Sequence, residues 1–212
     1  MILILRILIA IIILCIIDVI LDRKMTEYFY SVCQPIFEPK KWNKKYIKKS
    51  HNCYSYSMNQ LEKEREKKCY NLIKNKKKCK QRGPPRPSKK IYTFPKGKKV
   101  TCDSIMYGVN KNIPGVDILK NKNSKCPDDK YKVALFIDDK NKSYHFLRQD
   151  KCNNKEGIWS HKNAKGPVTQ LDAANNIIYN PEHANLNYSW VNYNHMCDYI
   201  CVPDNNHLKP AI

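Results

Sequence analysis

The sequence predicts an α+β fold in which an N-terminal membrane helix precedes helices packed on an antiparallel sheet. Three observations lead to this prediction. Residues 2–21 are almost entirely apolar, residues 52–111 carry apolar positions at helical spacing, and short strands separated by turn-forming residues follow residue 131. Because the helical patterns come before the strand patterns, the α and β elements are expected to segregate rather than alternate.

The apolar run reads "ILILRILIAIIILCIIDVIL" and is interrupted only by Arg6 and Asp18. About 20 apolar residues cross a bilayer as a helix, and no small-residue cleavage site follows the run. We therefore predict an uncleaved single-pass anchor at residues 1–22, which makes the membrane a partner. A signal segment is the alternative, so the protein is expected to be either membrane-anchored or secreted.

Composition divides the rest of the chain. Residues 23–48 are predicted as a basic polar linker, residues 49–205 as the α+β domain and residues 206–212 as a tail. Asn52 is expected to cap a helix that continues toward Cys69, and Thr101 to cap a helix at 101–111. The basic, proline-rich stretch 74–90 is predicted as an exposed loop. Strands are expected at 132–138, 143–149, 157–162, 177–179 and 196–202.

The chain is strongly basic, since 39 Lys and Arg against 19 Asp and Glu give a formal net charge of +20. Such a field favours contact with polyanions through the basic surface. Arg is scarce beside Lys, however, and Arg is the residue that nucleic-acid readers prefer. A Lys-rich solvated surface therefore stays open as the alternative, and the sequence does not give the oligomeric state.

The cysteines suggest disulfides. If Cys15 lies in the anchor and Cys53 is a free thiol, an even eight remain to pair in an oxidising compartment. Cys197 and Cys201 are expected on the same side of a strand, each bonded to a different partner. His195 precedes them, but the spacing is not that of a zinc site. Because phosphate-binding and HExxH motifs are also lacking in the sequence, no metal or cofactor is predicted.

Cys53 and two histidines form the candidate catalytic set. Cys53 follows the expected N-cap, and both a helix start and a neighbouring imidazole lower the pKa of a thiol. Period-two alternation places His145 on one face of its strand, and an antiparallel neighbour in suitable register would bring His161 beside it. Each residue also has a structural interpretation, as a buried thiol, a half-cystine, or a sheet or surface histidine.

These residues lie in segments that resemble a known group. "HNCYSYSMN" (51–59), "YHFLRQD" (144–150) and "GIWSHK" (157–162) are similar to the NCYxYxxN, YHFxRQ and GxWSHK segments of a largely uncharacterised family of bacteria and large DNA viruses. The similarity covers about residues 50–203. More distantly, the order of cysteine, histidine and polar residue resembles the papain-like hydrolases, including CHAP amidases. Two departures are the "KCNNKE" insertion, which could shift the strand register, and "WSHKNAKG" in place of a glycine step.

The resemblance implies a papain-like (CHAP-like) fold and a membrane-anchored cysteine peptidase or amidase acting on a peptide or cell-wall substrate. Cys53 would attack, His145 would act as base and His161 would orient it. Asn52 or backbone N–H groups would support the oxyanion. The alternative is a non-catalytic, disulfide-stabilised structural protein of a virion or host membrane surface. That alternative predicts that Cys53 is buried or paired and that the two histidines lie far apart. A third hypothesis is nucleic-acid association through 74–90.

Overall fold

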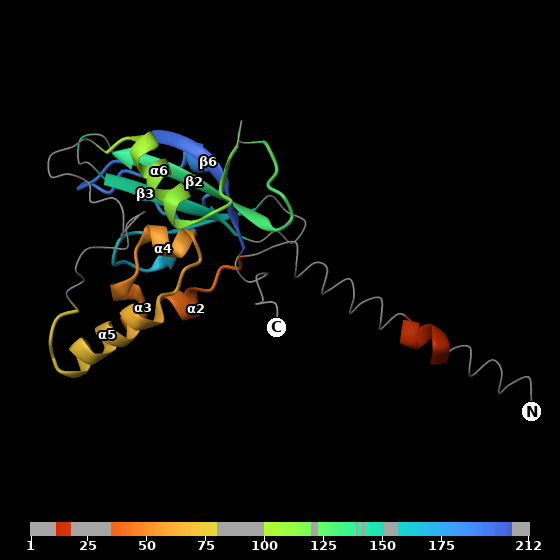
Figure 1. Ribbon diagram of the computed structural model, residues 1–212, viewed down its shortest axis with the longest axis horizontal. Coiled ribbons are helices and arrows are strands. Elements are labelled where there is room, and N and C mark those ends of the chain that lie inside the picture. Colours follow the sequence, from red (N-terminus) through yellow and green to blue (C-terminus); the bar gives the residue numbers. More distant parts are fainter. Residues whose placement is uncertain are drawn as a thin grey trace, which may run out of the picture. The chain divides into compact units, whose positions relative to one another are not determined.

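The computed structural model describes residues 12–17, 35–79, 100–119, 123–138, 140, 143–150 and 157–204 (Figure 1). The chain divides into two units, residues 1–34 and residues 35–212. Of the first unit, residues 12–17 are described, and they are helical. Within the described ranges, no helix has both the length and the apolar character needed to cross a membrane.

The predicted fold class is therefore wrong. A membrane helix was expected at residues 1–22, of which residues 12–17 are described, and no membrane-spanning helix is found among the described residues. The remainder of the expected anchor and the tail 206–212 lie outside the described residues. The architecture is a six-stranded antiparallel sheet accompanied by a few short helices.

The sheet has the strand order β1-β6-β2-β3-β4-β5 and every pairing is antiparallel. Its strands are β1 (Asp117–Ile118), β2 (Lys130–Asp138), β3 (Ser143–Gln149), β4 (Trp159–Lys162), β5 (Val168–Thr169) and β6 (His195–Pro203). The hairpin of β2 and β3 is confirmed. Where a strand was expected at 177–179, the structure has one bridge, between Leu171 and Ile177.

Alternating side chains give the sheet two apolar faces. On one face, Leu135 and Phe146 share a core cluster with residues of α4 and α6. On the other face, Phe136 and Leu147 pack with apolar residues of the segment 178–193. Neighbouring residues of β2 and β3 thus serve opposite cores, so His145 and Phe146 point to different faces.

The helices are α2 (Pro39–Trp42), α3 (Lys45–Ser50), α4 (Cys53–Ser57), α5 (Lys63–Lys74) and α6 (Cys102–Asn112), with a 3-10 turn η1 (Pro181–His183). In Figure 1, α6 lies against the sheet, whereas α2, α3 and α5 gather beside one another. Both expected caps are confirmed. Asn52 accepts a hydrogen bond from the Ser55 N–H, and Thr101 and Ser104 form a reciprocal capping box.

The helix expected from Asn52 toward Cys69 is instead two helices. Asn59 follows α4 with a φ of 50°, a left-handed conformation that ends a helix. The Glu62 N–H then donates to Nε2 of His51 at 2.9 Å, just before α5 begins. The break therefore depends on a contact between segments and not on helix propensity alone.

Three disulfides join six of the eight described cysteines: Cys69–Cys79, Cys102–Cys197 and Cys126–Cys201. The thiol of Cys53 is free, as the count of paired cysteines assumed, and it is buried, as the structural alternative predicted. Cys33 and Cys152, which were also expected to pair, lie outside the described residues. The prediction that Cys197 and Cys201 have different partners is confirmed.

A β-bulge interrupts β6 at Cys197. Leu135 of β2 stands opposite Asp198, and the next residue of β2 stands opposite Met196, so Cys197 is the extra residue. Unbroken alternation from Ile200, which faces the α6 side, would turn Cys197 away from that side. The bulge turns it back, and Cys197 packs against the α6 core.

The same bulge corrects one prediction. Cys201 lies between Ile200 and Val202, which both face the α6 side, and so it points to the opposite side. The expectation that Cys197 and Cys201 share a side is therefore wrong. An extra residue between two positions reverses their relative direction, and the sequence does not reveal it.

Candidate active site

The four predicted site residues lie on three elements that contact one another. Asn52 and Cys53 are at the start of α4, His145 is on β3 and His161 is on β4. All are buried. Cys53 keeps 6% of its surface exposed, and each histidine keeps 1%. The oxygen of the Asn52 side chain is engaged in capping α4 through the Ser55 N–H at 3.2 Å.

The two histidines are hydrogen-bonded to each other. Nε2 of His145 lies 2.9 Å from Nδ1 of His161, and Nε2 of His161 lies 2.9 Å from the carbonyl oxygen of Leu171. The register pairs His161 with Leu147 and not directly with His145. The rings therefore meet along the diagonal of the ladder, which aromatic side chains can span.

This chain of contacts fixes the tautomers of the neutral rings. A carbonyl oxygen can only accept, so Nε2 of His161 carries the proton and its Nδ1 is an acceptor. Nε2 of His145 must then donate to that acceptor. The lone pair of His145 is left on Nδ1, where it can act as a base.

Cys53 approaches the same strand from α4. Its Sγ lies 4.0 Å from the carbonyl oxygen of Tyr144, the residue before His145. The pairing of β3 with β4 covers Leu147–Gln149, so the thiol meets β3 beyond the end of that ladder. Cys53 belongs to the core cluster of Phe146, whereas His145 stacks on Tyr193 on the other face with the ring centroids 4.7 Å apart.

Burial keeps these groups neutral. Burial raises the pKa of the Cys53 thiol to about 11, although backbone N–H groups, first that of Phe146, oppose the rise. Burial, and then the charge of His161, lower the pKa of His145 well below its usual value. Burial also lowers the pKa of His161. Because the thiol pKa lies far above that of the imidazole, the resting pair is thiol and neutral imidazole, and not an ion pair.

Two tyrosines belong to the site and were not predicted. Tyr193 stacks on His145, and the Tyr188 hydroxyl lies 3.4 Å from Nε2 of His161. Both come from a loop segment after β5, in an aromatic-rich stretch "NYSWVNYNH". That enrichment in aromatic residues was the available signal, but their partners depend on the tertiary fold.

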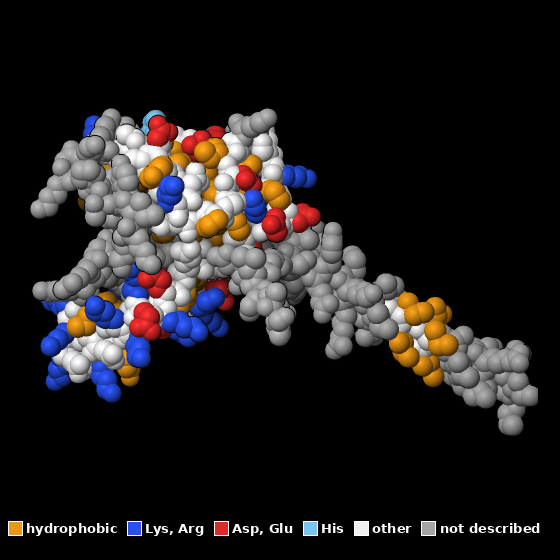
Figure 2. Space-filling model, in the orientation of Figure 1, with side chains coloured by type: hydrophobic (Ala, Val, Ile, Leu, Met, Phe, Trp, Pro, Cys, Tyr) orange, Lys and Arg blue, Asp and Glu red, His pale blue; other side chains and the backbone are white. Residues whose placement is uncertain are grey.

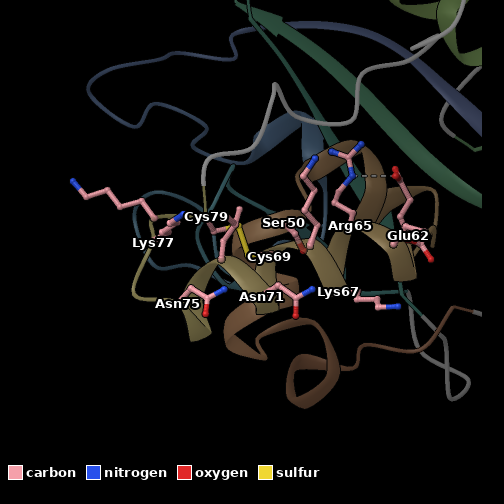
Figure 3. Close-up of a pocket in the computed structure, with 13 residues that line it drawn as sticks. Ser50, Glu62, Arg65, Lys67, Cys69, Asn71, Asn75, Lys77 and Cys79 are labelled. Carbon is pink, nitrogen blue, oxygen red and sulfur yellow. Dashed lines mark hydrogen bonds and ion pairs between the residues drawn. A yellow bond between two sulfur atoms is a disulfide. The ribbon is translucent and has the colours of Figure 1, made fainter.

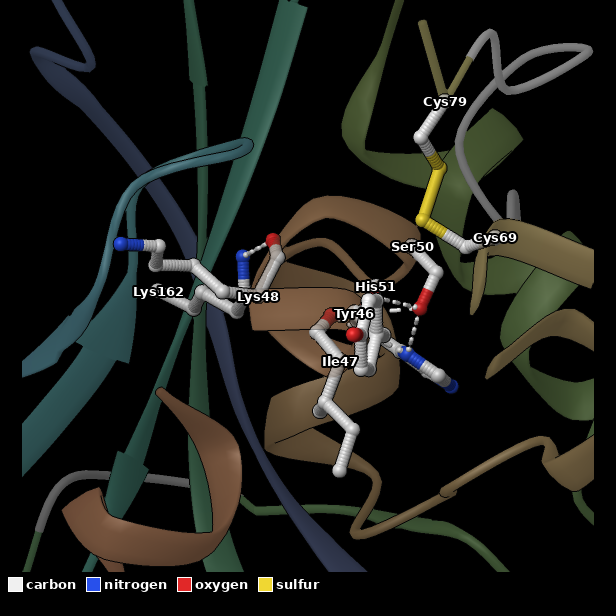
Figure 4. Close-up of a disulfide and its surroundings, with 8 residues drawn as sticks. All are labelled: Tyr46, Ile47, Lys48, Ser50, His51, Cys69, Cys79 and Lys162. Carbon is white, nitrogen blue, oxygen red and sulfur yellow. Dashed lines mark hydrogen bonds between the residues drawn. A yellow bond between two sulfur atoms is a disulfide. The ribbon is translucent and has the colours of Figure 1, made fainter. Parts of the chain in front are cut away.

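Lys162 is a second group that the sequence did not single out. Its Nζ donates to the carbonyl oxygen of Lys48 at 2.8 Å (Figure 4). It also donates to the carbonyl oxygen of Ala164 at 2.6 Å. Burial lowers the pKa of Lys162 to about 7, and the nearby Cys53 acts in the opposite direction. A buried amine with a lowered pKa therefore lies within electrostatic reach of the thiol.

His51 precedes the site in sequence but has a structural role. Its Nε2 accepts from the Glu62 N–H, and its Nδ1 lies 2.9 Å from the Ser50 hydroxyl (Figure 4). Burial lowers the pKa of His51 to about 4. With both ring nitrogens engaged, His51 ties α3 to the start of α5.

A hollow of about 1140 Å³ lies beside α5 and the Cys69–Cys79 disulfide (Figure 3). Its lining includes the cations Arg65, Lys67, Lys68, Lys77 and Lys78, against the acids Glu62 and Glu64. Arg65 is paired with Glu62 at 3.0 Å. In Figure 2, blue side chains gather over α5, so this hollow is part of a predominantly basic surface.

Comparison with known proteins does not assign the chain to a family. The chain matches no protein-family model, no curated protein and no solved structure. The resemblances to the NCYxYxxN family and to papain-like hydrolases therefore stay predictions, and the site is interpreted from its own geometry.

Proposed function

We propose that the domain is a cysteine hydrolase of amide bonds, with Cys53 as nucleophile, His145 as general base and His161 as the residue that orients the base. The observation that carries the proposal is the chain of contacts from His145 through His161 to the Leu171 carbonyl. It leaves a basic nitrogen on a buried ring of β3, next to the point where the thiol contacts that strand.

The proposed reaction follows general-base chemistry. Cys53 and His145 lie on opposite faces of β3, so the reaction requires the thiol and Nδ1 of His145 to meet at the edge of that strand. Nδ1 then accepts the thiol proton as sulfur attacks the carbonyl carbon, and it returns the proton to the departing amine. Water then cleaves the thioester with the same nitrogen as base. His161 keeps Nε2 of His145 bonded throughout and stabilises the transient imidazolium. Asn52 and the backbone N–H groups at the start of α4 stay the proposed oxyanion donors.

A peptide or a cell-wall cross-link is the proposed substrate class, because both contain the amide that this chemistry cleaves. Three disulfides in the described domain favour an oxidising compartment as its place of work.

The test is the rate of iodoacetamide alkylation at Cys53, followed by mass spectrometry of its peptide between pH 6 and pH 9. We expect a rate that rises with pH without a plateau, since the pKa of the thiol is about 11. His145→Ala should slow alkylation at pH 7.5 by about 100-fold, the usual contribution of a general base. His161→Gln, which keeps an acceptor for Nε2 of His145, should retain more reactivity than His161→Ala.

The matched control is His183→Ala, because His183 is an exposed histidine of η1. This variant should alkylate at the wild-type rate. Equal rates in wild type and His145→Ala would remove the base from the mechanism. Failure of native Cys53 to react up to pH 9, while the unfolded chain reacts, would refute the enzyme.

The second candidate is the structural protein, and one observation favours it. Cys53 is buried and its pKa is raised, as expected for a core thiol. The same hypothesis predicts that the two histidines lie far apart, however, and Nε2 of His145 lies 2.9 Å from Nδ1 of His161. An unreactive Cys53 in the experiment above would make it the better account.

A further inference from the structure

A second group of metal-ligating side chains lies where α6 begins beside β6. The sulfurs of Cys102 and Cys197 and a ring nitrogen of His195 all lie within 4.8 Å of one another. The two cysteines form a disulfide, with their Cα atoms 5.5 Å apart. None of these residues takes part in the proposed hydrolysis.

Local structure explains why the three converge. The capping box of Thr101 and Ser104 starts α6 at Cys102, and the Cys102 side chain packs against the core that α6 shares with the sheet. The bulge at Cys197 turns that side chain toward α6. By alternation through the bulge, Met196 packs on the opposite face, and His195 therefore returns to the α6 side.

The donor set suits a thiophilic divalent cation. Two thiolates and an imidazole are zinc ligands, at about 2.3 Å for sulfur and 2.0–2.1 Å for nitrogen. Tetrahedral geometry then requires ligand atoms about 3.5–3.8 Å apart. The two sulfurs, bonded to each other in the disulfide, must therefore separate on reduction, while the His195 nitrogen already lies within 4.8 Å of both. His195 is exposed and both cysteines are partly exposed, so an ion can reach them. Each cysteine is followed by an aspartate, Asp103 or Asp198, and a carboxylate or a water would complete the set.

We propose that Cys102, His195 and Cys197 form a redox-gated site for Zn²⁺ or a similar thiophilic divalent cation, closed by the disulfide and opened by reduction. A dithiol reductant transfers two electrons and two protons to the disulfide, giving two thiols, and is itself oxidised to a cyclic disulfide. The ion then displaces the two thiol protons and bonds to both sulfurs and to the imidazole. A purely structural disulfide would need no histidine at this position.

The experiment titrates Co²⁺ into the full chain and follows the thiolate-to-cobalt charge-transfer absorption. We expect no signal from the oxidised protein and a one-to-one complex after reduction, displaced by Zn²⁺. His195→Ala should weaken binding by more than about tenfold, because even residues outside the ligand set contribute that much. Cys126→Ala with Cys201→Ala removes a different disulfide and should leave Co²⁺ binding intact, whereas Cys102→Ala with Cys197→Ala should abolish it.

Reduction breaks every disulfide and can unfold the chain, so a second variant keeps the proposal testable. Cys102→His removes this disulfide alone and supplies an imidazole under oxidising conditions. It should bind one Co²⁺ without reductant, and addition of His195→Ala should weaken that binding. Absence of a one-to-one complex in both the reduced protein and oxidised Cys102→His would overturn the proposal.

Discussion

The guanidinium of Arg148 is fully buried and is shared between three segments. It donates to Asp150 Oδ1 at 3.2 and 3.3 Å, to the Tyr56 carbonyl and hydroxyl oxygens, and to the Ile36 carbonyl oxygen. It also lies 4.1 Å from the centroid of the Tyr56 ring. Arg148 therefore links α4, the chain before α2, and the strand that carries His145.

Replacing Arg148 with Met should destabilise the domain by about 3–5 kcal/mol, because the Asp150 carboxylate stays buried without its cation. Urea unfolding monitored by tyrosine and tryptophan fluorescence measures the change. Adding Asp150→Asn should recover part of the loss. As a control, Lys41→Met removes an exposed pair with Glu38 and should cost less than about 1 kcal/mol. A loss of that small size for Arg148→Met would contradict this account.

At the scale of elements, disulfides that join distant segments should matter most. Cys102–Cys197 and Cys126–Cys201 close loops with sequence separations of 95 and 75, whereas Cys69–Cys79 spans 10. Chain-entropy arguments make the larger loops worth about 4.5 kcal/mol and the small loop about 2.7 kcal/mol. The order of stability loss on double Cys→Ala replacement should therefore follow loop size.

Guanidinium unfolding of the three double variants tests this order. Each pair is removed while the other two disulfides are kept. If loss of Cys69–Cys79 proved as costly as loss of Cys126–Cys201, the local packing of α5 would dominate over loop closure.

Elements were predictable from sequence where their causes are local. Asn52 and Thr101 are caps because their own side chains bond N–H groups three residues on, and β3 follows from a period-two pattern. The end of α4 at Ser57 and the bulge at Cys197 were not predictable. The end of α4 is followed by a hydrogen bond from the Glu62 N–H to the His51 ring, and the bulge depends on the register of β6 with β2. In each case the partner residue lies elsewhere in the sequence.

For the site, the sequence indicated Cys53, His145 and His161, because thiol and imidazole are scarce and chemically distinctive. Their electrostatics could not be read in advance. A low thiol pKa was expected from the helix start and a neighbouring imidazole, whereas burial raises the pKa of Cys53 to about 11. The places of Tyr193 and Lys162 near the site depend on contacts with residues distant in sequence: Tyr193 stacks on His145, and Lys162 donates to the Lys48 carbonyl oxygen.

At the scale of the whole molecule, the formal net charge of +20 favours polyanion contact. We expect retention on phosphocellulose that falls with salt. Replacing Lys67, Lys68 and Lys77 at the hollow beside α5 with Glu should lower the eluting salt concentration. A control with Lys111, Lys125 and Lys165 changed to Glu alters the net charge equally at exposed sites elsewhere.

If retention depends on the surface around the hollow beside α5, the α5 variant should elute at a lower salt concentration than the control. Identical elution of the two variants would mean that total charge alone governs binding. Retention unaffected by salt would exclude an electrostatic contact altogether.

The position of β6 inside the sheet has a consequence for biosynthesis. Among the described strands β6 is made last, yet it lies between β1 and β2 and carries half of two disulfides. The nascent chain therefore exposes the edge of β2 until residues 195–203 emerge. Such an unpaired edge is the kind on which chains aggregate. Completion of the sheet must therefore wait for β6, and oxidation of Cys102 and Cys126 before that moment can produce only non-native pairs.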